Sequence, residues 1–275
     1  MSIDYEAEYN NRARVPEHPA IIAGWARDAA AYRESAGGAL GLAYGNGERT
    51  RLNIFGDGRG PVVLFIHGGY WQGLDRSSFS HLARGLVSRG VTVAAPSYDL
   101  CPAVTVSTIV DQMREACAFV WRRFERPVVV AGHSAGGHLA ACMLATNWGA
   151  IDPALPAGLV PSAYALSGLF DLEPLVGTSV NTALGLDAAE ARRLSPLFWE
   201  APRGRTLDAV VGGAESAEYL RQSRTIADAW GKAGVQTRYE AVEGANHFTV
   251  IAPLADPGSP MTRRLATLAE AAARP

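Results

Sequence analysis

The segment GHSAG at residues 132–136 places a serine, Ser134, between small residues on a turn. An apolar run at 127–131 precedes the turn, and a helix-prone run at 138–144 follows it. On such a strand-to-helix turn the serine hydroxyl is held clear of the sheet, beside free N–H groups that favour a developing negative charge. The pattern therefore predicts that Ser134 is a nucleophile.

A serine nucleophile needs a base, and His247 is the best placed of the six histidines. It follows the last predicted strand and precedes the last predicted helix, where the chain order nucleophile, acid, histidine puts the base. Its imidazole can take the serine proton and later return it to the leaving group. We expect His133 to point under the turn, His67 to brace a second turn, and the other histidines to be packed or surface residues.

The third member is a carboxylate that orients the histidine, and two candidates remain open. Glu215 lies in the loop after the apolar strand at 209–211, the usual position of this acid, where glutamate can replace aspartate. Asp171 follows the preceding strand and is the main competitor. We favour Glu215. We expect Glu218 to be an exposed carboxylate at the start of a helix. Asp208 begins its strand, at the end opposite to the predicted site.

A second turn, HGGYW at residues 67–71, directly follows the apolar run at 62–66. Its consecutive glycines, Gly68 and Gly69, allow backbone N–H groups to face a reacting centre that side chains would block. Together with the N–H of Ala135 they would form an oxyanion hole. Each donor of this kind typically lowers a barrier by about 2.7–4 kcal/mol.

The elements that must position these residues alternate along the chain. After a helix at 18–36 and a hairpin at 40–44 and 49–55, short apolar strands are predicted at 62–66, 91–95, 128–131, 163–166, 209–211 and 237–242. Helices are predicted at 77–88, 106–124, 137–147, 217–232 and 260–273. All-apolar strands separated by helices indicate a parallel sheet covered on both faces, with ligands beyond the carboxyl ends of the strands.

Composition narrows the class of protein. With 275 residues, 48% of them hydrophobic and 19% charged, the chain suits a single α/β domain over 1–275. A net charge of -2 without a basic tract makes nucleic acid an unexpected partner. We expect no membrane span, a cytoplasmic location, reduced buried cysteines, and neither a metal nor an organic cofactor. Whether the chain forms a homodimer is left open.

The segment at 67–71 resembles the HGGxW signature of the kynurenine formamidase (arylformamidase) group of α/β-hydrolases. Further similar segments are Tyr44-Gly45, Leu74-Asp75, YDLCP at 98–102, SGLFDL at 167–172, LSP at 194–196 and NHF at 246–248. The resemblance implies an α/β-hydrolase fold, with Ser134 as nucleophile, His247 as base, and the N–H groups of the two turns as the oxyanion hole. The group usually has aspartate at the acid position, where this chain has Glu215, so Asp171 stays a candidate.

The chemistry that we expect is acyl transfer to the serine and hydrolysis of the acyl-enzyme by water. Tyr70 and Trp71 are expected to bind substrate and to favour a formyl or short N-acyl aryl amide, such as N-formylkynurenine. A carboxylesterase for short-chain or aryl esters is the alternative, and a non-catalytic ligand-binding protein on the same fold is a third hypothesis. The alternative for Trp71 is a place in the core.

Two segments flank this predicted site. The N-terminal helical segment, 1–38, could cover its mouth or pack as a surface helix. The segment at 167–200 is expected to form a small cap-like insertion.

Overall fold

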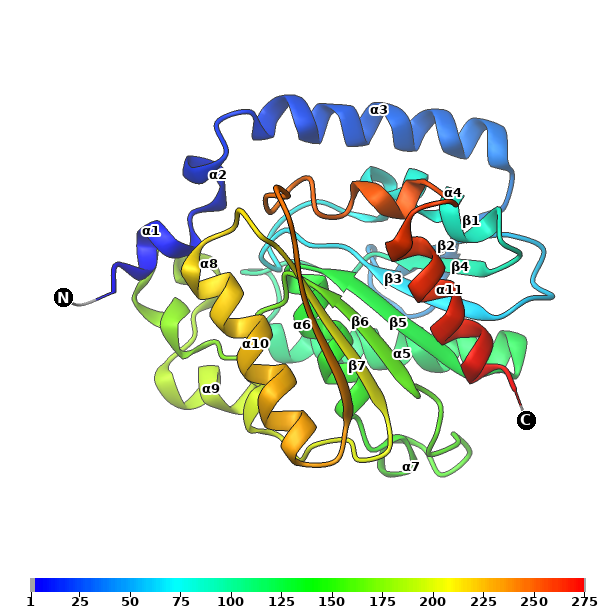
Figure 1. Ribbon diagram of the computed structural model, residues 1–275. Coiled ribbons are helices and arrows are strands. Elements are labelled where there is room, and N and C mark those ends of the chain that lie inside the picture. Colours follow the sequence, from blue (N-terminus) through cyan, green and yellow to red (C-terminus); the bar gives the residue numbers. More distant parts are fainter. Residues whose placement is uncertain (1–2, 275) are drawn as a thin grey trace.

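The computed structural model describes residues 3–274 and contains one eight-stranded sheet (Figure 1). The strands lie in the order β1-β2-β4-β3-β5-β6-β7-β8. β2 runs antiparallel to both of its neighbours, and β3 to β8 are parallel. Their bounds are β1 (Ala39–Ala43), β2 (Arg51–Phe55), β3 (Val62–Ile66), β4 (Thr92–Pro96), β5 (Val128–His133), β6 (Ser162–Leu166), β7 (Thr206–Gly212) and β8 (Gln236–Val242).

The central strands are buried on both faces, and every residue of β3 and β5 is buried. Along β3, Val62, Leu64 and Ile66 pack into one apolar cluster. Val63 and Phe65 pack into a second cluster on the opposite face. Because successive side chains of a strand point to opposite faces, an all-apolar strand contributes to both layers. The sheet is therefore sandwiched between two apolar layers.

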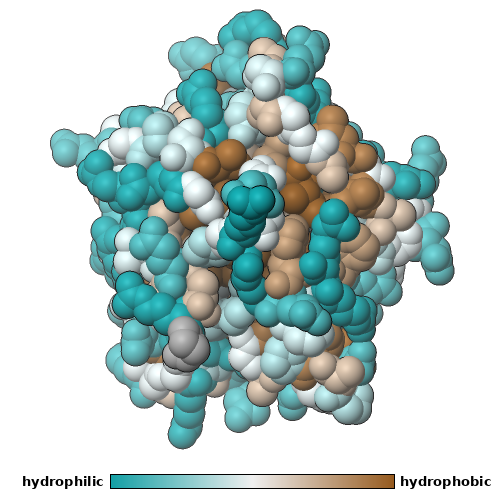
Figure 2. Space-filling model, turned by 90° about the vertical axis from the view of Figure 1, so that its right-hand side faces the viewer, coloured by the Kyte–Doolittle hydropathy of each residue, from teal (hydrophilic) through white to brown (hydrophobic). Residues whose placement is uncertain are grey.

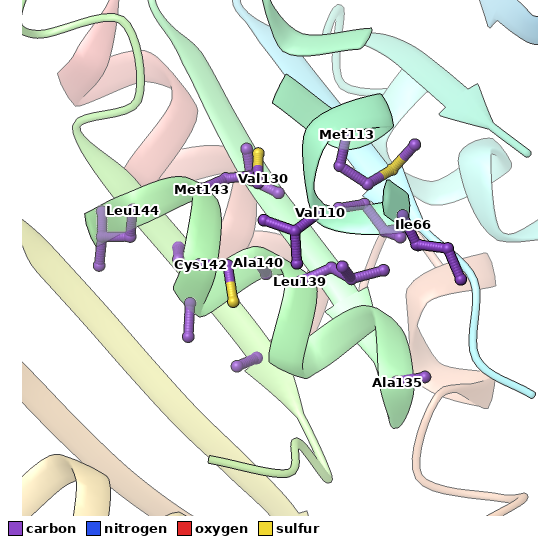
Figure 3. Close-up of a cluster of buried hydrophobic side chains, with 14 of the residues drawn as sticks. Ile66, Val110, Met113, Val130, Ala135, Leu139, Ala140, Cys142, Met143 and Leu144 are labelled. Atoms are coloured by element: carbon purple, nitrogen blue, oxygen red, sulfur yellow. The ribbon is translucent and has the colours of Figure 1, made fainter. Parts of the chain in front are cut away.

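Helices cover both faces, which confirms the predicted fold class. One layer contains α5 (Val106–Phe124), α6 (Ala135–Ala145) and α10 (Ala217–Lys232), and the other contains α3 (His18–Ala36), α4 (Ala83–Val87) and α11 (Pro260–Ala272). Figure 3 shows Leu139 of α6 beside Val110 and Met113, which belong to α5. This packing anchors α6, and the residue before its first turn is Ser134.

The predicted helix at 77–88 is wrong. The chain there forms two 3₁₀ turns, η1 (Arg76–Ser78) and η2 (Ser80–Leu82), before the short α4. Ser77 Oγ donates to Asp75, and Ser80 Oγ donates to the carbonyl of Arg76. Serine hydroxyls that bond to nearby groups in this way compete with regular helix formation. The other predicted strands and helices are confirmed within a few residues of their predicted ends.

The N-terminal segment lies against the connection between β6 and β7. It forms α1 (Tyr5–Tyr9) and α2 (Asn11–Arg14), and the connection contains η3 (Glu173–Gly177), α8 (Asn181–Leu184), α9 (Ala188–Arg193) and η4 (Pro196–Phe198). Glu6 accepts hydrogen bonds from Ser179, from N at 2.7 Å and from Oγ at 2.8 Å. The N–H of Glu218, on α10, donates to Glu8 at 2.9 Å. These bonds connect the N-terminal segment to the β6–β7 connection and to α10.

Figure 2 shows the face at the right of Figure 1, where hydrophilic side chains surround patches of hydrophobic ones. Within residues 3–274, no helix has the length and apolar character of a membrane span. Each of the three cysteines is buried and free. Two short helical elements complete the fold, α7 (Trp148–Ile151) and η5 (Ala252–Ala255).

Candidate active site

Ser134 lies on a strained turn between β5 and α6. Its φ of 58° and ψ of -118° are rare for a residue with a side chain. A Cβ at Gly132 would collide with the Gly136 carbonyl oxygen, and a Cβ at Gly136 would collide with the carbonyl oxygen of Ile66. The glycines on either side of the serine are therefore required for this turn to form.

His247 and Glu215 form a buried pair at the carboxyl end of the sheet. His247 Nδ1 lies 2.6 Å from Glu215 Oε2, and their side chains are 7% and 0% exposed. The other carboxylate oxygen, Oε1, accepts from Ser167 Oγ at 2.5 Å and from the N–H of Gly212 at 2.7 Å. Because the Nδ1–H of His247 faces the carboxylate, Nε2 is the ring nitrogen that is left to act as a base.

His133 holds the backbone of the His247 loop. Its Nε2–H donates to the carbonyl oxygen of His247 at 2.8 Å, and the two ring centroids are 4.7 Å apart. Burial holds the pKa of His133 well below its usual range, so this ring stays neutral. His133 therefore supports the loop, and it also lines the pocket beside Ser134.

The structure brings Ser134 and His247 to the same pocket. Among residues 3–274, His247 Nδ1 is bonded to Glu215, and no hydrogen bond joins Ser134 Oγ to His247 Nε2. Bonds between nucleophile and base are often long in structures without substrate and tighten when it binds. The serine hydroxyl must therefore turn toward His247 before it can react.

The second turn lies directly against the nucleophile. A Cβ at Gly68 would stand 3.0 Å from Ser134 Cβ, and Gly69, with φ of +113°, lines the pocket. In the part of the chain that the structure describes, the N–H groups of Gly68, Gly69 and Ala135 donate to no backbone carbonyl. These groups are therefore free to stabilise an oxyanion.

His67 braces that turn, as predicted. Its Nδ1–H donates to the carbonyl oxygen of Gly68 at 2.7 Å. Its ring stacks on the ring of Tyr98, with the two centroids 4.3 Å apart. Burial lowers the pKa of His67 to about 4, so the ring is neutral at pH 7. His67 thus supports the backbone and does not face the pocket.

Tyr70 and Trp71 are neighbours in the sequence but lie in different environments. Tyr70 lines the pocket, and its hydroxyl donates to the carbonyl oxygen of Tyr9 at 2.7 Å. Trp71 is 0% exposed, packs edge-on against His138 with ring centroids 5.0 Å apart, and does not line the pocket. The predicted substrate-binding role of Trp71 is therefore wrong, because its indole fills the core beneath the turn.

The competing carboxylates lie elsewhere. Asp171 is 3.7 Å from Arg221, and burial raises its pKa above the usual range. Glu218 is buried, not exposed as predicted, and it accepts from Tyr9 at 2.9 Å and from Arg221 at 2.8 Å. Of these acids, Glu215 is the one in contact with His247.

The pocket above Ser134 has a volume of about 480 Å³. Its walls come from the N-terminal helices α1 and α2, from Ile22 and Trp25 of α3, from the turns after β3 and β5, from the residues around Ser179, and from the loop of His247. The N-terminal segment therefore covers the site, and α3 both lines the pocket and packs against the sheet layer. A larger hollow of about 760 Å³ lies along α5, away from the nucleophile. Within residues 3–274, no group of three or more His, Cys, Asp or Glu side chains could hold a metal ion.

Sequence reasoning missed Asn11, Tyr219 and Ser167. Asn11 is 6% exposed and donates from Nδ2 to the Tyr219 hydroxyl at 2.9 Å. Tyr219 is an aromatic residue within an amphipathic helix, a pattern that ordinarily indicates core packing. For Ser167, the signal in the sequence was its place in the segment at 167–172, which resembles the kynurenine formamidase group.

A strained serine, a histidine–carboxylate pair and unbonded N–H groups at the carboxyl end of a parallel sheet define an α/β-hydrolase. A family model described as alpha/beta hydrolase fold matches residues 63–251. The chain is 31% identical over 237 residues to the kynurenine formamidase of Danio rerio, a match that covers 82% of this chain and 80% of the relative. It is also 31% identical to the kynurenine formamidase of Drosophila melanogaster, covering 82% and 79%.

The chain therefore belongs to the kynurenine formamidase family of α/β-hydrolases. Among solved structures, it resembles a protein of Silicibacter sp. TM1040 provisionally named a thioesterase, with 36% identity and a TM-score of 0.83. That likeness covers 95% of this chain and 98% of the other. These relationships make the chain an amide or ester hydrolase, and they confirm the family resemblance of its motifs.

Proposed function

We propose that this chain hydrolyses N-formyl or short N-acyl aryl amides, N-formylkynurenine among them, through an acyl-enzyme on Ser134. The observation that carries the proposal is one pocket of about 480 Å³, lined by Ser134, His247 and Tyr70. A pocket of this size suits a small molecule. The names of the kynurenine formamidase relatives support the same chemistry.

In the first half of the reaction, His247 Nε2 takes the Ser134 proton as Oγ attacks the carbonyl carbon. The resulting oxyanion accepts hydrogen bonds from the N–H groups of Gly68, Gly69 and Ala135. The C–N bond then breaks, and the proton on His247 moves to the leaving nitrogen. The aryl amine departs, and the acyl group remains on the serine.

In the second half, water takes the place of the amine. His247 removes a proton from the water as its oxygen attacks the acyl carbon, and the Ser134 Oγ–C bond breaks. The same proton returns to Oγ, and formate or another short carboxylate leaves. Throughout, the Glu215 carboxylate holds the imidazole in position and balances the positive charge that develops on it.

An aromatic leaving group suits the walls of the pocket. Trp25, Tyr70 and Phe248 all line it, and flat side chains pack favourably against a flat ring. An aryl amine also leaves more readily than an alkylamine, so serine chemistry of the esterase type can cleave its amide. These features favour an aryl amide, while esters of similar size fit the same machinery.

The test is a kinetic comparison of purified wild type with Ser134→Ala. We expect kcat/KM for an N-formyl aryl amine to exceed that for p-nitrophenyl acetate, once leaving-group reactivity is taken into account. Ser134→Ala should hydrolyse neither substrate. The reverse preference would replace the formamidase assignment with a carboxylesterase, and the acyl-enzyme mechanism would stand.

A fluorophosphonate probe separates a hydrolase from a ligand-binding protein on the same fold. Wild type should be labelled at Ser134, and Ser134→Ala should not. If wild type stays unlabelled under conditions in which a known serine hydrolase reacts, the nucleophilic role proposed for Ser134 fails.

A further inference from the structure

Asn11 brings a polar atom to the pocket that the acyl-transfer steps do not use. The residue is 6% exposed and lines the cavity. Its Nδ2 donates to the Tyr219 hydroxyl at 2.9 Å and lies 3.4 Å from the Tyr70 hydroxyl. In the part of the chain that the structure describes, Asn11 Oδ1 has no hydrogen-bond partner, and it is not among the unbonded polar atoms that protein encloses. Because the rest of the residue is buried, the open space that Oδ1 faces is the pocket.

The hydrogen bonds around Asn11 fix which end of its amide faces the pocket. Tyr70 donates its single proton to the carbonyl oxygen of Tyr9, at 2.7 Å. In its contact of 2.6 Å with the Tyr219 hydroxyl, Tyr70 must therefore accept, and the proton of Tyr219 is directed to Tyr70. Toward Asn11 the Tyr219 oxygen can only accept, which requires the NH₂ end of the amide. The oxygen end, Oδ1, is left for the pocket.

The side chains that hold Asn11 belong to the surroundings of the catalytic groups. Tyr70 directly follows Gly69 of the oxyanion turn. The ring of Tyr219 packs on the ring of His247, with the two centroids 4.7 Å apart. Asn11 Oδ1 is thus an acceptor on a fixed side chain, in the wall between the oxyanion turn and the base. An acceptor that is ordered before substrate binds loses little conformational entropy when it binds.

A substrate that covers this oxygen must supply a hydrogen to it, because a buried acceptor without a donor weakens binding. The proposed substrates share one donor, the N–H of the scissile amide. We propose that Asn11 Oδ1 accepts a hydrogen bond from this N–H and thereby makes the site prefer amides to esters. This inference rests on the proposed function.

The course of the reaction brings the N–H to the side of the pocket where Asn11 lies. The leaving nitrogen must approach His247 to receive a proton, and the tyrosine that packs on His247 is the one that holds Asn11 Nδ2. The N–H bond itself is kept in the product amine. Asn11 therefore gains and loses no proton, and it acts only by holding the amide.

An ester or an N-methyl amide cannot make this bond. The leaving oxygen of an ester carries no hydrogen, and the nitrogen of an N-methyl amide carries none either. When one of these substrates covers Asn11 Oδ1, the oxygen loses its contact with water and gains no donor. A site that hydrogen-bonds an N–H discriminates against analogues that lack it. Removal of the acceptor should therefore reduce the preference for the N–H amide.

The experiment compares Asn11→Leu with wild type on three substrates that share one aromatic ring: the N-formyl amine, its N-methyl analogue and the aryl formate ester. Leucine is close to asparagine in size but has no acceptor. We expect kcat/KM for the N-formyl amine, relative to that for either analogue, to fall roughly tenfold, the effect of one hydrogen bond to the reacting group. The ratios are taken within one preparation, so an unfolded fraction leaves them unchanged.

Asn10→Leu is the matched control, because Asn10 lines the same wall but its Oδ1 already accepts from the N–H of Ala13 at 3.1 Å. This variant disturbs the start of α2 without removing an unbonded acceptor, so its ratios should match those of wild type. An unchanged ratio in Asn11→Leu, or an equal change in Asn10→Leu, would overturn the inference.

Failure of the proposed function would give a different result, since wild type would then cleave no N-formyl aryl amine. Binding to Ser134→Ala still tests Asn11 in that case, because this variant holds the substrate without cleaving it. Calorimetry should show that adding Asn11→Leu raises Kd for the N-formyl amine roughly tenfold and leaves Kd for the N-methyl analogue close to its former value. Equal changes in the two Kd values, or no change in either, would contradict the role given to Asn11.

Discussion

Ser167 Oγ donates a hydrogen bond of 2.5 Å to Glu215 Oε1, and Glu215 Oε2 lies 2.6 Å from His247 Nδ1. Ser167 follows β6, and its φ of 51° is rare for a residue with a side chain. Its N–H donates to the Val210 carbonyl oxygen at 2.7 Å, which ties this conformation to β7. One carboxylate oxygen is thus held by fixed donors, and the other is left for the histidine.

Substitution of the two candidate acids, one at a time, should show which of them orients His247. Glu215→Gln keeps the shape of the side chain but removes the charge that orients and balances His247, so we expect kcat to fall by about 10⁴-fold. Asp171→Asn should stay close to wild type, because Asp171 contacts Arg221 and not the histidine. Steady-state kinetics measure both, with thermal unfolding as a check on folding. Equal losses, or a larger loss for Asp171→Asn, would reverse the assignment.

Ser167→Ala should remove one of the hydrogen bonds that hold the Glu215 carboxylate, without a direct effect on substrate binding. We expect kcat to fall about tenfold, the effect of one lost hydrogen bond, while KM stays unchanged. Ser195→Ala is the control, because Ser195 is also buried and makes its hydrogen bonds to Ala191 and Leu172 instead. That variant should lose stability but keep kcat. A rise in KM with kcat unchanged in Ser167→Ala would argue for a role in substrate binding.

Trp71→Phe tests the place of Trp71 in the core. Loss of buried volume should lower the free energy of unfolding by about 1–3 kcal/mol. The relative kcat/KM for aryl and alkyl N-formyl amines should not change, because Trp71 does not reach the pocket. Urea unfolding and substrate kinetics measure the two effects. A changed preference between the substrates would restore the substrate-binding role.

Buried histidines should make the fold sensitive to acid. Burial lowers the pKa of His67 and of His138 to about 4, whereas an unfolded histidine titrates near 6.5. Their neutral forms stabilise the fold fully above pH 6.5, and this contribution is lost as the pH falls toward 4, by up to about 3 kcal/mol for each. Unfolding in urea at several pH values between 7 and 4 measures the loss.

One variant can measure how much His138 contributes to this acid sensitivity. His138 Nε2–H donates to the Leu194 carbonyl oxygen at 2.8 Å, and glutamine offers an N–H donor that does not titrate. His138→Gln should therefore show a shallower fall in stability over the same pH range. An unchanged slope would mean that His138 does not contribute to the acid sensitivity.

The sequence by itself determined the parts of the protein that depend on local pattern. All-apolar runs specify buried strands, and the glycines around Ser134 and at Gly69 specify turns that a side chain would prevent. Because the carboxyl ends of parallel strands meet at one edge, the loops that carry Ser134, Glu215 and His247 could be expected together.

Only the tertiary structure decided which neighbours those residues have. Asn11 and Tyr219 are 208 positions apart in the chain, yet their side chains form a hydrogen bond, and Asn11 lines the same pocket as Ser134. Trp71 enters the core while the adjacent Tyr70 lines the pocket, which depends on the φ angles of one turn. Residue type and spacing specify local conformation, whereas such contacts arise from the packing of distant segments. For that reason the surroundings of the nucleophile had to be found in three dimensions.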